Sequence, residues 1–344
     1  MISQQTPAIV SAVLKEYGAA TRDAIAAYCA PGSARRYLDD LAADYPKRGG
    51  KMMRPSLCLA TARAFGAEFG DALCTSVAIE LMHNAMLIHD DIEDGSTERR
   101  GKPTLHVRHG IPLAINAGDS LTLMSLQPLI DNRSTIGPRL AARVLEETMT
   151  MARATAEGQA LELGWRKDNA LDLDASDYLT MVLNKTCWFG TIYPTRIGAL
   201  IGTRDGIDLE PFVRFGFFLG AAFQIQDDLL NLVADERYGK ELGGDLWEGK
   251  RTLMLIRLLQ TAEPGVRRRL AAMLERAREQ RTLRDVQWIR KMMERYHCIE
   301  YARGVAHGLA GAAQHEYSSL FSGLPESRDK RFIEGLVTWV FERI

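Results

Sequence analysis

Apolar residues recur every three or four positions along nearly every long segment of the chain. Leu73, Val77 and Leu81 show this spacing, and Leu140 and Val144 show it again further on. Such a spacing places the apolar side chains along one face of an α-helix, whereas the alternation typical of a half-buried strand is short and rare here. The sequence therefore predicts an all-α protein.

Glycine and proline divide this helical pattern into roughly a dozen predicted helices. The breaks fall at residues 31–32, 49–50, 95–103, 110–112, 137–138, 202–206, 239–249 and 264–265. None of them is a Ser/Pro-rich linker, and the chain shows no repeat of fixed period. We therefore expect residues 1–344 to form a single domain, a large helical bundle, with an N-terminal helix in residues 1–30 and C-terminal helices over about 260–344.

Charge balance and cysteine content argue against several classes of protein. The chain has 43 Lys and Arg against 44 Asp and Glu, a net charge of −1, so nothing favours nucleic acid or an anionic membrane as a partner. Its five cysteines are scattered and form no C-x-x-C pair, which argues against disulfides or zinc and favours a cytoplasmic location. No run of about 18 uncharged apolar residues occurs, so we expect no transmembrane segment, and the charges in residues 1–30 argue against a signal peptide.

An acidic motif ends the apolar stretch at residues 87–94. Asp90, Asp91 and Asp94 stand at i, i+1 and i+4, which places the first and last about 40° apart on one helix face. Carboxylates this close repel one another unless a cation neutralises them, and a set of hard oxygen ligands suits magnesium. Taken alone, the motif is equally compatible with a solvated acidic helix end.

A second motif repeats this geometry inside another apolar helix, at residues 223–231, with Asp227, Asp228 and Asn231. Carboxylates on a core-facing helix are costly unless they coordinate metal or face a wet cavity. The pair of motifs predicts two helices that face each other across a polar pocket. Such a pocket would bind a polyanion bridged by metal ions.

Three basic segments adjoin these motifs and suit the phosphate groups of such a ligand. Lys51 and Arg54 follow a Gly pair, Arg99 and Arg100 follow the first acidic motif, and the last segment contains two glycine–lysine pairs, with Lys240 and Lys250. Arginine in particular makes bidentate contacts to phosphate oxygens. Each segment alone is more often an ordinary surface turn.

Together these motifs resemble the trans-isoprenyl (polyprenyl) diphosphate synthase family, and its geranylgeranyl-type members in particular. The resemblance covers residues 49–255 and rests on motifs in the family's order. These are G-G-K-x-x-R-P, D-D-x-x-D with its R-R-G-x-P-T tail, Gly158-Gln159, Lys185-Thr186, F-Q-I-x-D-D, and the closing G-K with D-L-x-E-G-K. It implies an isoprenoid-synthase bundle around a central cavity, usually in a homodimer, that joins isopentenyl diphosphate head-to-tail to an allylic diphosphate.

The same resemblance implies a role for each matching residue. Magnesium, three ions when diphosphate is bound, is expected on Asp90, Asp91, Asp94, Asp227 and Asp228. The allylic diphosphate is expected to contact Arg99, Lys185, Gln224, Lys240 and Lys250, and the metal-free isopentenyl diphosphate site to use Lys51, Arg54, His83 and Arg100. Lys185, Thr186 and Gln224 would stabilise the transient positive charge. Without the neighbouring motif, His83 would be interpreted as a core histidine.

One position departs from the family pattern. The second motif usually ends in Asp, and here Asn231 keeps an oxygen ligand without the charge, which would weaken magnesium binding. The same replacement is familiar in geranylgeranyl-type members, so Asn231 stays among the expected ligands.

Product length is expected to depend on the residues that precede the first motif. Aromatic residues four or five positions before the first Asp stop chain growth in the family, and here those positions are Met86 and Ala85, with Leu81 and Met82 one turn deeper. The small Ala85 leaves room and methionine yields space readily. We expect a product of twenty carbons or longer, with geranylgeranyl diphosphate as the best single choice. A row of Met and Leu is also ordinary core packing.

Two other functions fit part of this pattern. A class I terpene cyclase also uses acidic helical motifs and magnesium, but it has no need of a second diphosphate site such as Lys51, Arg54 and Arg100. A non-catalytic regulatory subunit of a prenyl synthase would normally have degraded motifs, and here only Asn231 departs.

Overall fold

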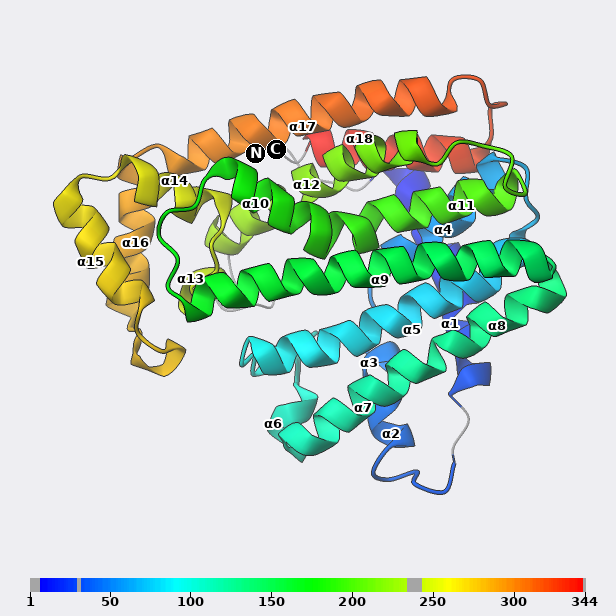
Figure 1. The fold of residues 1–344 in the computed structure, drawn as a ribbon, viewed down its shortest axis with the longest axis horizontal. Helices are drawn as coiled ribbons and strands as arrows, with labels where there is room; N and C mark the ends of the chain where they lie inside the picture. Colours follow the sequence, from blue (N-terminus) through cyan, green and yellow to red (C-terminus); the bar gives the residue numbers. More distant parts are fainter. Residues whose placement is uncertain (1–6, 30–31, 234–242, 343–344) are drawn as a thin grey trace. The chain divides into compact units, whose positions relative to one another are not determined.

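The computed structural model describes residues 7–29, 32–233 and 243–342, and these are almost entirely helical (Figure 1). The all-α prediction is confirmed. The chain divides into two compact units, each assembled from segments that are distant in sequence. The first unit comprises residues 1–150, 193–212 and 320–336, and the second comprises residues 151–192, 213–319 and 337–344. A single domain around a central cavity stays a prediction.

The first unit contains the helices before residue 150 and a small hairpin. Its elements are α1 (Ala8–Tyr28), α2 (Asp39–Ala42), α3 (Asp44–Lys47), α4 (Met53–Ala64), α5 (Phe69–Glu93), β1 (Glu98–Arg99), β2 (Lys102–Pro103), α6 (Leu105–His109), α7 (Ile111–Met124), α8 (Leu126–Thr135) and α11 (Tyr193–Gly202). It also holds the first parts of α9 (Pro138–Lys167), α12 (Glu210–Val233) and α18 (Arg328–Glu342). Helix α1 lies within the predicted N-terminal segment, residues 1–30.

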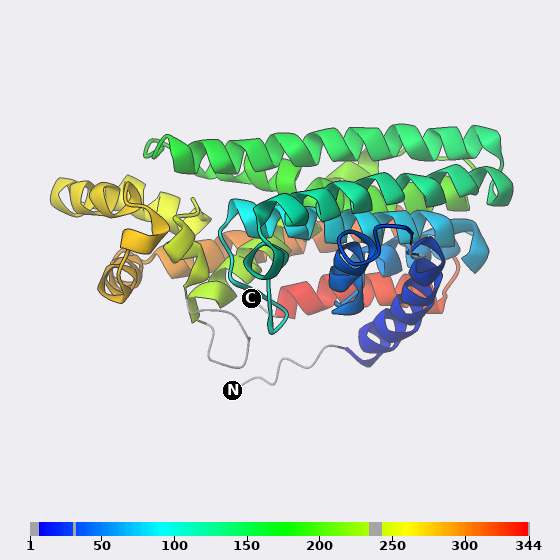
Figure 2. The same cartoon turned by 90° about the horizontal axis from the view of Figure 1, so that it is seen from below.

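Helix α5 is the centre of the first unit, because α1, α4, α7 and α8 all pack against it (Figure 1). Its buried residues Leu81, Ala85 and Ile88 form one apolar cluster with Ala117 and Leu121 of α7. The start of α18 (red) reaches α1 (dark blue) in Figure 2, where the Tyr17 hydroxyl donates to Asp329. This packing fixes the end of α5, which carries the first acidic motif.

A second close contact in the first unit joins α4 to α11. A Cβ atom added at Gly198 would lie 2.7 Å from the carbonyl oxygen of Cys58, and one at Gly202 would lie 2.6 Å from that of Ala62. Glycine is therefore required at both positions for the two backbones to approach this closely. The contact holds the second half of α4, the helix whose first turn includes Arg54, against α11.

The second unit holds the remaining elements. They are the rest of α9, α12 and α18, together with α10 (Ala175–Val182), the π-helix η1 (Leu183–Ile192), α13 (Gly244–Glu248), α14 (Leu253–Thr261), α15 (Pro264–Leu274), the 3₁₀-helix η3 (Arg278–Gln280), α16 (Leu283–Arg295) and α17 (Cys298–Phe321). Ile225 and Leu229 of α12 pack in one core with Leu255 of α14 and Met293 of α16. Helices α15 to α18 lie within the predicted C-terminal segment, about 260–344.

The estimate of a dozen helices was too low, because α2, α3, α6 and α13 have only four or five residues each. A helix of one turn is too short for the periodicity of apolar residues to reveal it. None of the helices in the described part of the chain is long and apolar enough to cross a membrane.

Candidate active site

The first acidic motif lies at the C-terminal end of α5. Asp90 and Asp91 occupy its last turn, and Asp94 is the C-cap residue. Asp91 is fully buried and Asp94 is 4% exposed, whereas the Asp90 side chain is 26% exposed. Residues 90 and 94 are one helical turn apart, so their carboxylates lie on the same face of the helix end.

The middle carboxylate of this motif is held by protein donors on both oxygens. The Tyr45 hydroxyl donates to Asp91 Oδ2 at 2.5 Å, and Arg99 Nε donates to Asp91 Oδ1 at 2.9 Å. Burial alone would lower the pKa of Arg99, but the hydrogen bond to Asp91 and the charge of that carboxylate keep it above its ordinary value. Asp91 therefore anchors Arg99. Nothing in the sequence pattern singled out Tyr45.

Arg99 and Arg100 lie on a hairpin that directly follows the motif. Glu98 pairs with Pro103 and Arg99 with Lys102, so Arg100 and Gly101 form a two-residue turn. Both turn residues have positive φ, +55° and +70°, as a type I′ turn requires. The turn keeps both arginines beside the end of α5, and the Arg99 Nη2 atom lies 3.5 Å from Asp90 Oδ2.

The predicted basic set of Arg54, His83 and Arg100 comes together within the first unit. Arg54 Nη1 lies 3.4 Å from His83 Nε2, and because guanidinium only donates, this His83 nitrogen is the acceptor. Burial, followed by the positive charges of Arg54, Arg100 and Arg99, holds the pKa of His83 well below its ordinary value, so the ring is neutral. Lys51 is exposed and lies three residues before Arg54 in the chain.

A buried carboxylate that sequence patterns missed lies next to these residues. Glu80 is 2% exposed, accepts a hydrogen bond from Asn84 Nδ2 at 3.0 Å, and interacts electrostatically with Arg54 and Arg100. Burial raises the pKa of Glu80, although the two arginines oppose this effect. Glu80 lies on α5, one turn before His83, and belongs to no sequence motif. Only its buried negative charge near the basic residues identifies it.

The second acidic motif lies in α12, in the second unit. Asp227 is exposed, whereas Asp228 is 7% exposed and bound on both oxygens, by the Tyr178 hydroxyl at 2.8 Å and by Gln224 Nε2 at 2.8 Å. Burial, with a smaller contribution from Asp245, raises the pKa of Asp228 to about 8. A nearby cation would relieve this unfavourable burial of negative charge.

Asn231, the position that departs from the family pattern, is bonded to the segment that follows α12. Its Oδ1 accepts from the backbone N–H of Asp245 at 3.1 Å, and its carbonyl oxygen accepts from Gly243 N–H at 3.1 Å. The side chain thereby ties the start of α13 to α12. An amide oxygen has a second lone pair, so its role as a metal ligand stays a prediction.

Two lysines after this motif are predicted to contact the allylic diphosphate. Lys240 lies outside the described residues. Lys250 Nζ lies 2.9 Å from Glu248 Oε2 and 3.8 Å from Asp245 Oδ1. Lys250 is thus held near carboxylates of α13.

Lys185 and Thr186 lie on the ten-residue π-helix η1. Lys185 Nζ donates to Glu162 Oε1 of α9 at 2.7 Å, and Thr186 Oγ1 donates to Gln224 Oε1 of α12 at 3.1 Å. A π-helix is rare and is frequently found at functional sites. The predicted catalytic residues are therefore fixed by bonds to both flanking helices, and Glu162 is a further residue that the sequence pattern missed.

Close approach of α9 holds this π-helix in place. A Cβ atom at Gly158 would lie 2.1 Å from the backbone nitrogen of Lys185 and 2.6 Å from its Cα. Because the neighbouring atoms are backbone, no side-chain rotation relieves such a clash. The glycine of the Gly158-Gln159 motif therefore has a steric reason in this fold.

The residues predicted to control product length lie on α5, one to two turns before the first motif. Leu81 and Ala85 are fully buried in the cluster shared with α7, Met82 is 7% exposed, and Met86 is half-buried. Ala117 of α7 belongs to that cluster, so small side chains occur on both helices. Control of product length stays a prediction.

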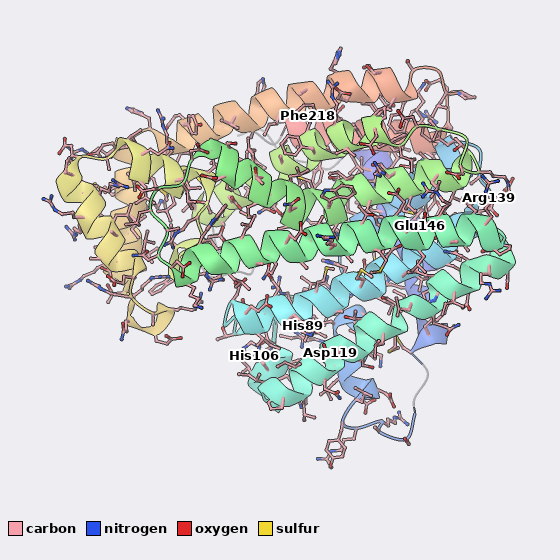
Figure 3. All side chains as sticks on the ribbon, in the orientation of Figure 1. His89, His106, Asp119, Arg139, Glu146 and Phe218 are labelled. Carbon is pink, nitrogen blue, oxygen red and sulfur yellow. The ribbon has the colours of Figure 1, made fainter. Side chains whose placement is uncertain are left out.

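His89 precedes the motif and lies against α7. Its Nε2 is 3.4 Å from Asp119 Oδ1, and both residues are labelled in Figure 3. A Cβ at Gly118 would lie 2.4 Å from His89 Nε2, so glycine makes room for the ring. This contact fixes the last turn of α5 from the side of α7.

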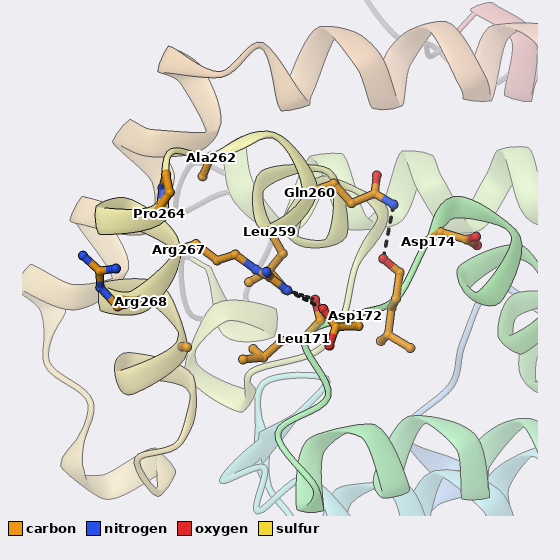
Figure 4. A pocket seen from close by; sticks show the side chains of 11 residues that line it. Leu171, Asp172, Asp174, Leu259, Gln260, Ala262, Pro264, Arg267 and Arg268 are labelled. Atoms are coloured by element: carbon orange, nitrogen blue, oxygen red, sulfur yellow. Dashed lines mark hydrogen bonds and ion pairs between the residues drawn. The ribbon is translucent and has the colours of Figure 1, made fainter.

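The second unit has a surface cavity of about 810 Å³ (Figure 4). It is lined by residues 171–174 and by α14 and α15, and Arg267 forms an ion pair with Asp172 across it. Its lining contains none of the predicted site residues, and we propose no function for it.

The described residues contain no group of three His, Cys, Asp or Glu side chains arranged to hold a metal ion by themselves. Magnesium is usually bound through one or two carboxylates together with water and substrate phosphates. The donor set fits that mode: Asp90 and Asp94 share one helix end, and buried Asp228 lies beside exposed Asp227.

Comparison with known proteins places the chain in a family. The family model of polyprenyl synthetase matches residues 35–293. A short chain isoprenyl diphosphate synthase of Methanothermobacter thermautotrophicus is 37% identical over 259 residues, which are 75% of this chain and 77% of that protein. The chain therefore belongs to the polyprenyl synthetase family.

Solved structures agree with this assignment. Geranylgeranyl pyrophosphate synthetase from Pyrococcus horikoshii matches with a TM-score of 0.85 and 31% identity, covering 97% of this chain and 98% of that one. A polyprenyl synthase from Caulobacter crescentus, complexed with calcium and isoprenyl diphosphate, matches with a TM-score of 0.80 and 26% identity over 98% of both chains. The sequence-based family resemblance is thus confirmed.

The close approach at Gly158 yields a first prediction. Gly158→Ala has to displace η1 or α9 by about an ångström, and a misplacement of that size lowers turnover about 100-fold. Steady-state rates of the purified variant measure this loss. Gly164→Ala is the matched control, because it is in the same helix with no atom within 4 Å of the added Cβ. Equal rates for both variants would show that the approach at Gly158 has no catalytic importance.

Proposed function

We propose that this protein is a prenyl diphosphate synthase that condenses isopentenyl diphosphate with an allylic diphosphate. The observation that carries the proposal is the hairpin after α5, where adjacent arginines serve different neighbours. Arg99 binds the carboxylates of the acidic motif, and Arg100 belongs to the basic set around His83. One unit thus combines groups for a metal-bridged diphosphate with groups for a metal-free one. The family and the named relatives support the same activity.

Recognition of isopentenyl diphosphate would rest on Lys51, Arg54, His83 and Arg100. Arginine pairs well with phosphate oxygens. A neutral His83 already accepts from Arg54, so it holds that guanidinium in place. Glu80 interacts electrostatically with Arg54 and Arg100 of this set.

The allylic diphosphate would bind through magnesium held by Asp90, Asp94, Asp227 and Asp228, with Asn231 as a weaker ligand. Bound magnesium, expected as three ions, would stabilise negative charge on the departing diphosphate as the allylic carbon–oxygen bond breaks. Asp91 would keep Arg99 oriented towards the same diphosphate. Lys240 and Lys250 would add positive charge.

The remaining chemistry belongs to η1 and α12. Lys185 would exchange its ion pair with Glu162 for one with the diphosphate. Thr186 and Gln224 would direct their oxygen dipoles towards the positive charge that develops on the allylic carbon. No side chain has to form a covalent bond to the substrate. Tyr178 would support this arrangement through Asp228.

A class I terpene cyclase and a regulatory subunit are the alternative functions. The basic set around His83 disfavours the cyclase, which binds a single diphosphate. The intact contacts of Lys185, Thr186 and Asp228 disfavour a subunit without activity.

The five free thiols support the proposed cytoplasmic location.

Product analysis tests this proposal. Purified protein is incubated with magnesium, isopentenyl diphosphate and, separately, dimethylallyl, geranyl or farnesyl diphosphate, and the products are identified by mass spectrometry. We expect prenyl diphosphates that end at one length of twenty carbons or more, most simply geranylgeranyl diphosphate. Cyclised hydrocarbon without consumption of isopentenyl diphosphate would establish the cyclase instead.

Product length gives a prediction on α5. Replacing Ala85 by Val, Leu and Phe fills the space beside Met86 in increasing steps, so the product should become shorter with side-chain size while the first condensation continues. Mass spectrometry measures the product, and thermal melting checks that the enlarged core still folds, because overpacking costs about 1–3 kcal/mol. An active Ala85→Phe enzyme with unchanged product length would remove Ala85 from the pocket floor.

The expected homodimer has a suitable surface in the first unit. Large apolar side chains are exposed along α7, α8 and the first part of α9. They include Ile115 at 42%, Leu123 at 68%, Ile130 at 53%, Leu145 at 43% and Met149 at 62%. An exposed apolar patch of this kind marks a protein contact, and a second copy is the occupant that the family resemblance implies.

Charge on that surface should separate the dimer. Leu123→Asp with Ile130→Asp should give particles of 38.3 kDa, the mass of one chain, where the wild type gives twice that mass. Light scattering after size exclusion measures it. Leu283→Asp, a leucine that is 57% exposed on α16, is the control and should remain dimeric. A double variant of unchanged mass would place the interface elsewhere.

A further inference from the structure

Arg48, between α3 and the start of α4, is a buried arginine that no motif includes. Its side chain is 1% exposed. Nη1 donates to the carbonyl oxygens of Arg99 at 3.0 Å and Lys102 at 3.3 Å, Nη2 donates to that of Pro103 at 2.8 Å, and Nε donates to Asp44. One guanidinium therefore binds both strands of the hairpin.

The hairpin needs such support, because each of its strands has only two residues. A two-stranded ribbon of this size is not stable by itself. Arg100 adds strain, since a non-glycine residue at φ +55° is disfavoured unless its surroundings impose that conformation. The contacts from Arg48 supply external hydrogen bonds to three carbonyl groups of this short element.

Tyr45 connects the same guanidinium to the acidic motif. The Arg48 Cζ atom lies 4.5 Å from the centroid of the Tyr45 ring, the Tyr45 hydroxyl donates to Asp91, and the Tyr45 carbonyl accepts from Arg100 Nη1 at 3.3 Å. The neighbouring residue Asp44 also pairs with Arg108 of α6. The hairpin is thus fixed to α3 on one side and to the end of α5 on the other.

We propose that Arg48 is a positioning residue that fixes Arg99 and Arg100 together and thereby sets the affinity for both diphosphate substrates. This proposal rests on the function proposed above. Arg48 itself touches neither substrate, because its donors are directed at backbone carbonyls and Asp44. Since the two arginines are consecutive residues of one turn, loosening the turn weakens both sites at once.

Lysine cannot replace this arginine. An ammonium group is a point charge without the planar fork that reaches several carbonyls in fixed directions, and it does not stack on an aromatic ring as guanidinium does. Arg48→Lys therefore keeps the charge and removes the geometry.

The test compares Arg48→Lys with Arg196→Lys. Arg196 is an equally charged arginine of the first unit, 8% exposed in its side chain and bound to Glu147 of α9 and Glu210 of α12. We expect Arg48→Lys to raise KM for isopentenyl diphosphate and for the allylic diphosphate about tenfold each, with a smaller change in kcat. Arg196→Lys should leave both KM values unchanged. Added guanidinium ion should partly restore affinity in Arg48→Ala.

Unchanged KM values for both substrates in Arg48→Lys would overturn the proposal. If the melting temperature of this variant were lower at the same time, Arg48 would only support folding. Binding of inorganic pyrophosphate, measured by calorimetry, separates this from failure of the proposed function. A wild type that forms no prenyl product, but whose pyrophosphate affinity falls in Arg48→Lys and not in Arg196→Lys, retains the positioning role without the reaction.

Discussion

Both units depend on a buried carboxylate that is held by a tyrosine hydroxyl. Tyr45 binds Asp91 in the first unit and Tyr178 binds Asp228 in the second. In each case the other carboxylate oxygen is bound by a side chain of the proposed site, Arg99 or Gln224. Burying an unbound carboxylate would be strongly unfavourable, so these bonds are what allow an acidic motif to lie inside an apolar helix bundle. The second Asp of each motif thereby orients its neighbour, Arg99 in the first unit and Gln224 in the second.

The basic side of the first unit follows the same rule with the charges reversed. Arg99 and Arg100 stay in place because Asp91, Arg48 and Tyr45 hold their side chains and their backbone. His83 stays neutral because burial and three arginines disfavour its charged form. A diphosphate would meet groups that are already oriented, so little ordering entropy remains to be lost on binding.

The sequence predicted the fold class, the family and the residues with distinctive spacing, such as Asp90, Asp228 and Lys185. It could not predict Tyr45, Glu80, Arg48 or Glu162, because each is a single residue whose role comes from a tertiary contact and not from a pattern. The π-helix was equally invisible, and its close approach to Gly158 is a tertiary contact that the sequence pattern does not show. The bond from Asn231 to the start of α13 likewise appears only once the chain folds back after α12. Short helices such as α2 and α3 escaped because one turn has no periodicity.

We propose that the protein binds two diphosphates by different chemistry, one through magnesium and one through side chains alone. Calorimetric titration with isopentenyl diphosphate and with an unreactive thio-analogue of geranyl diphosphate, each with and without magnesium, tests it most directly. We expect the analogue to bind only when magnesium is present, whereas isopentenyl diphosphate should bind in both conditions. Binding of the analogue with magnesium, but no binding of isopentenyl diphosphate in either condition, would contradict it and indicate a protein with a single diphosphate site.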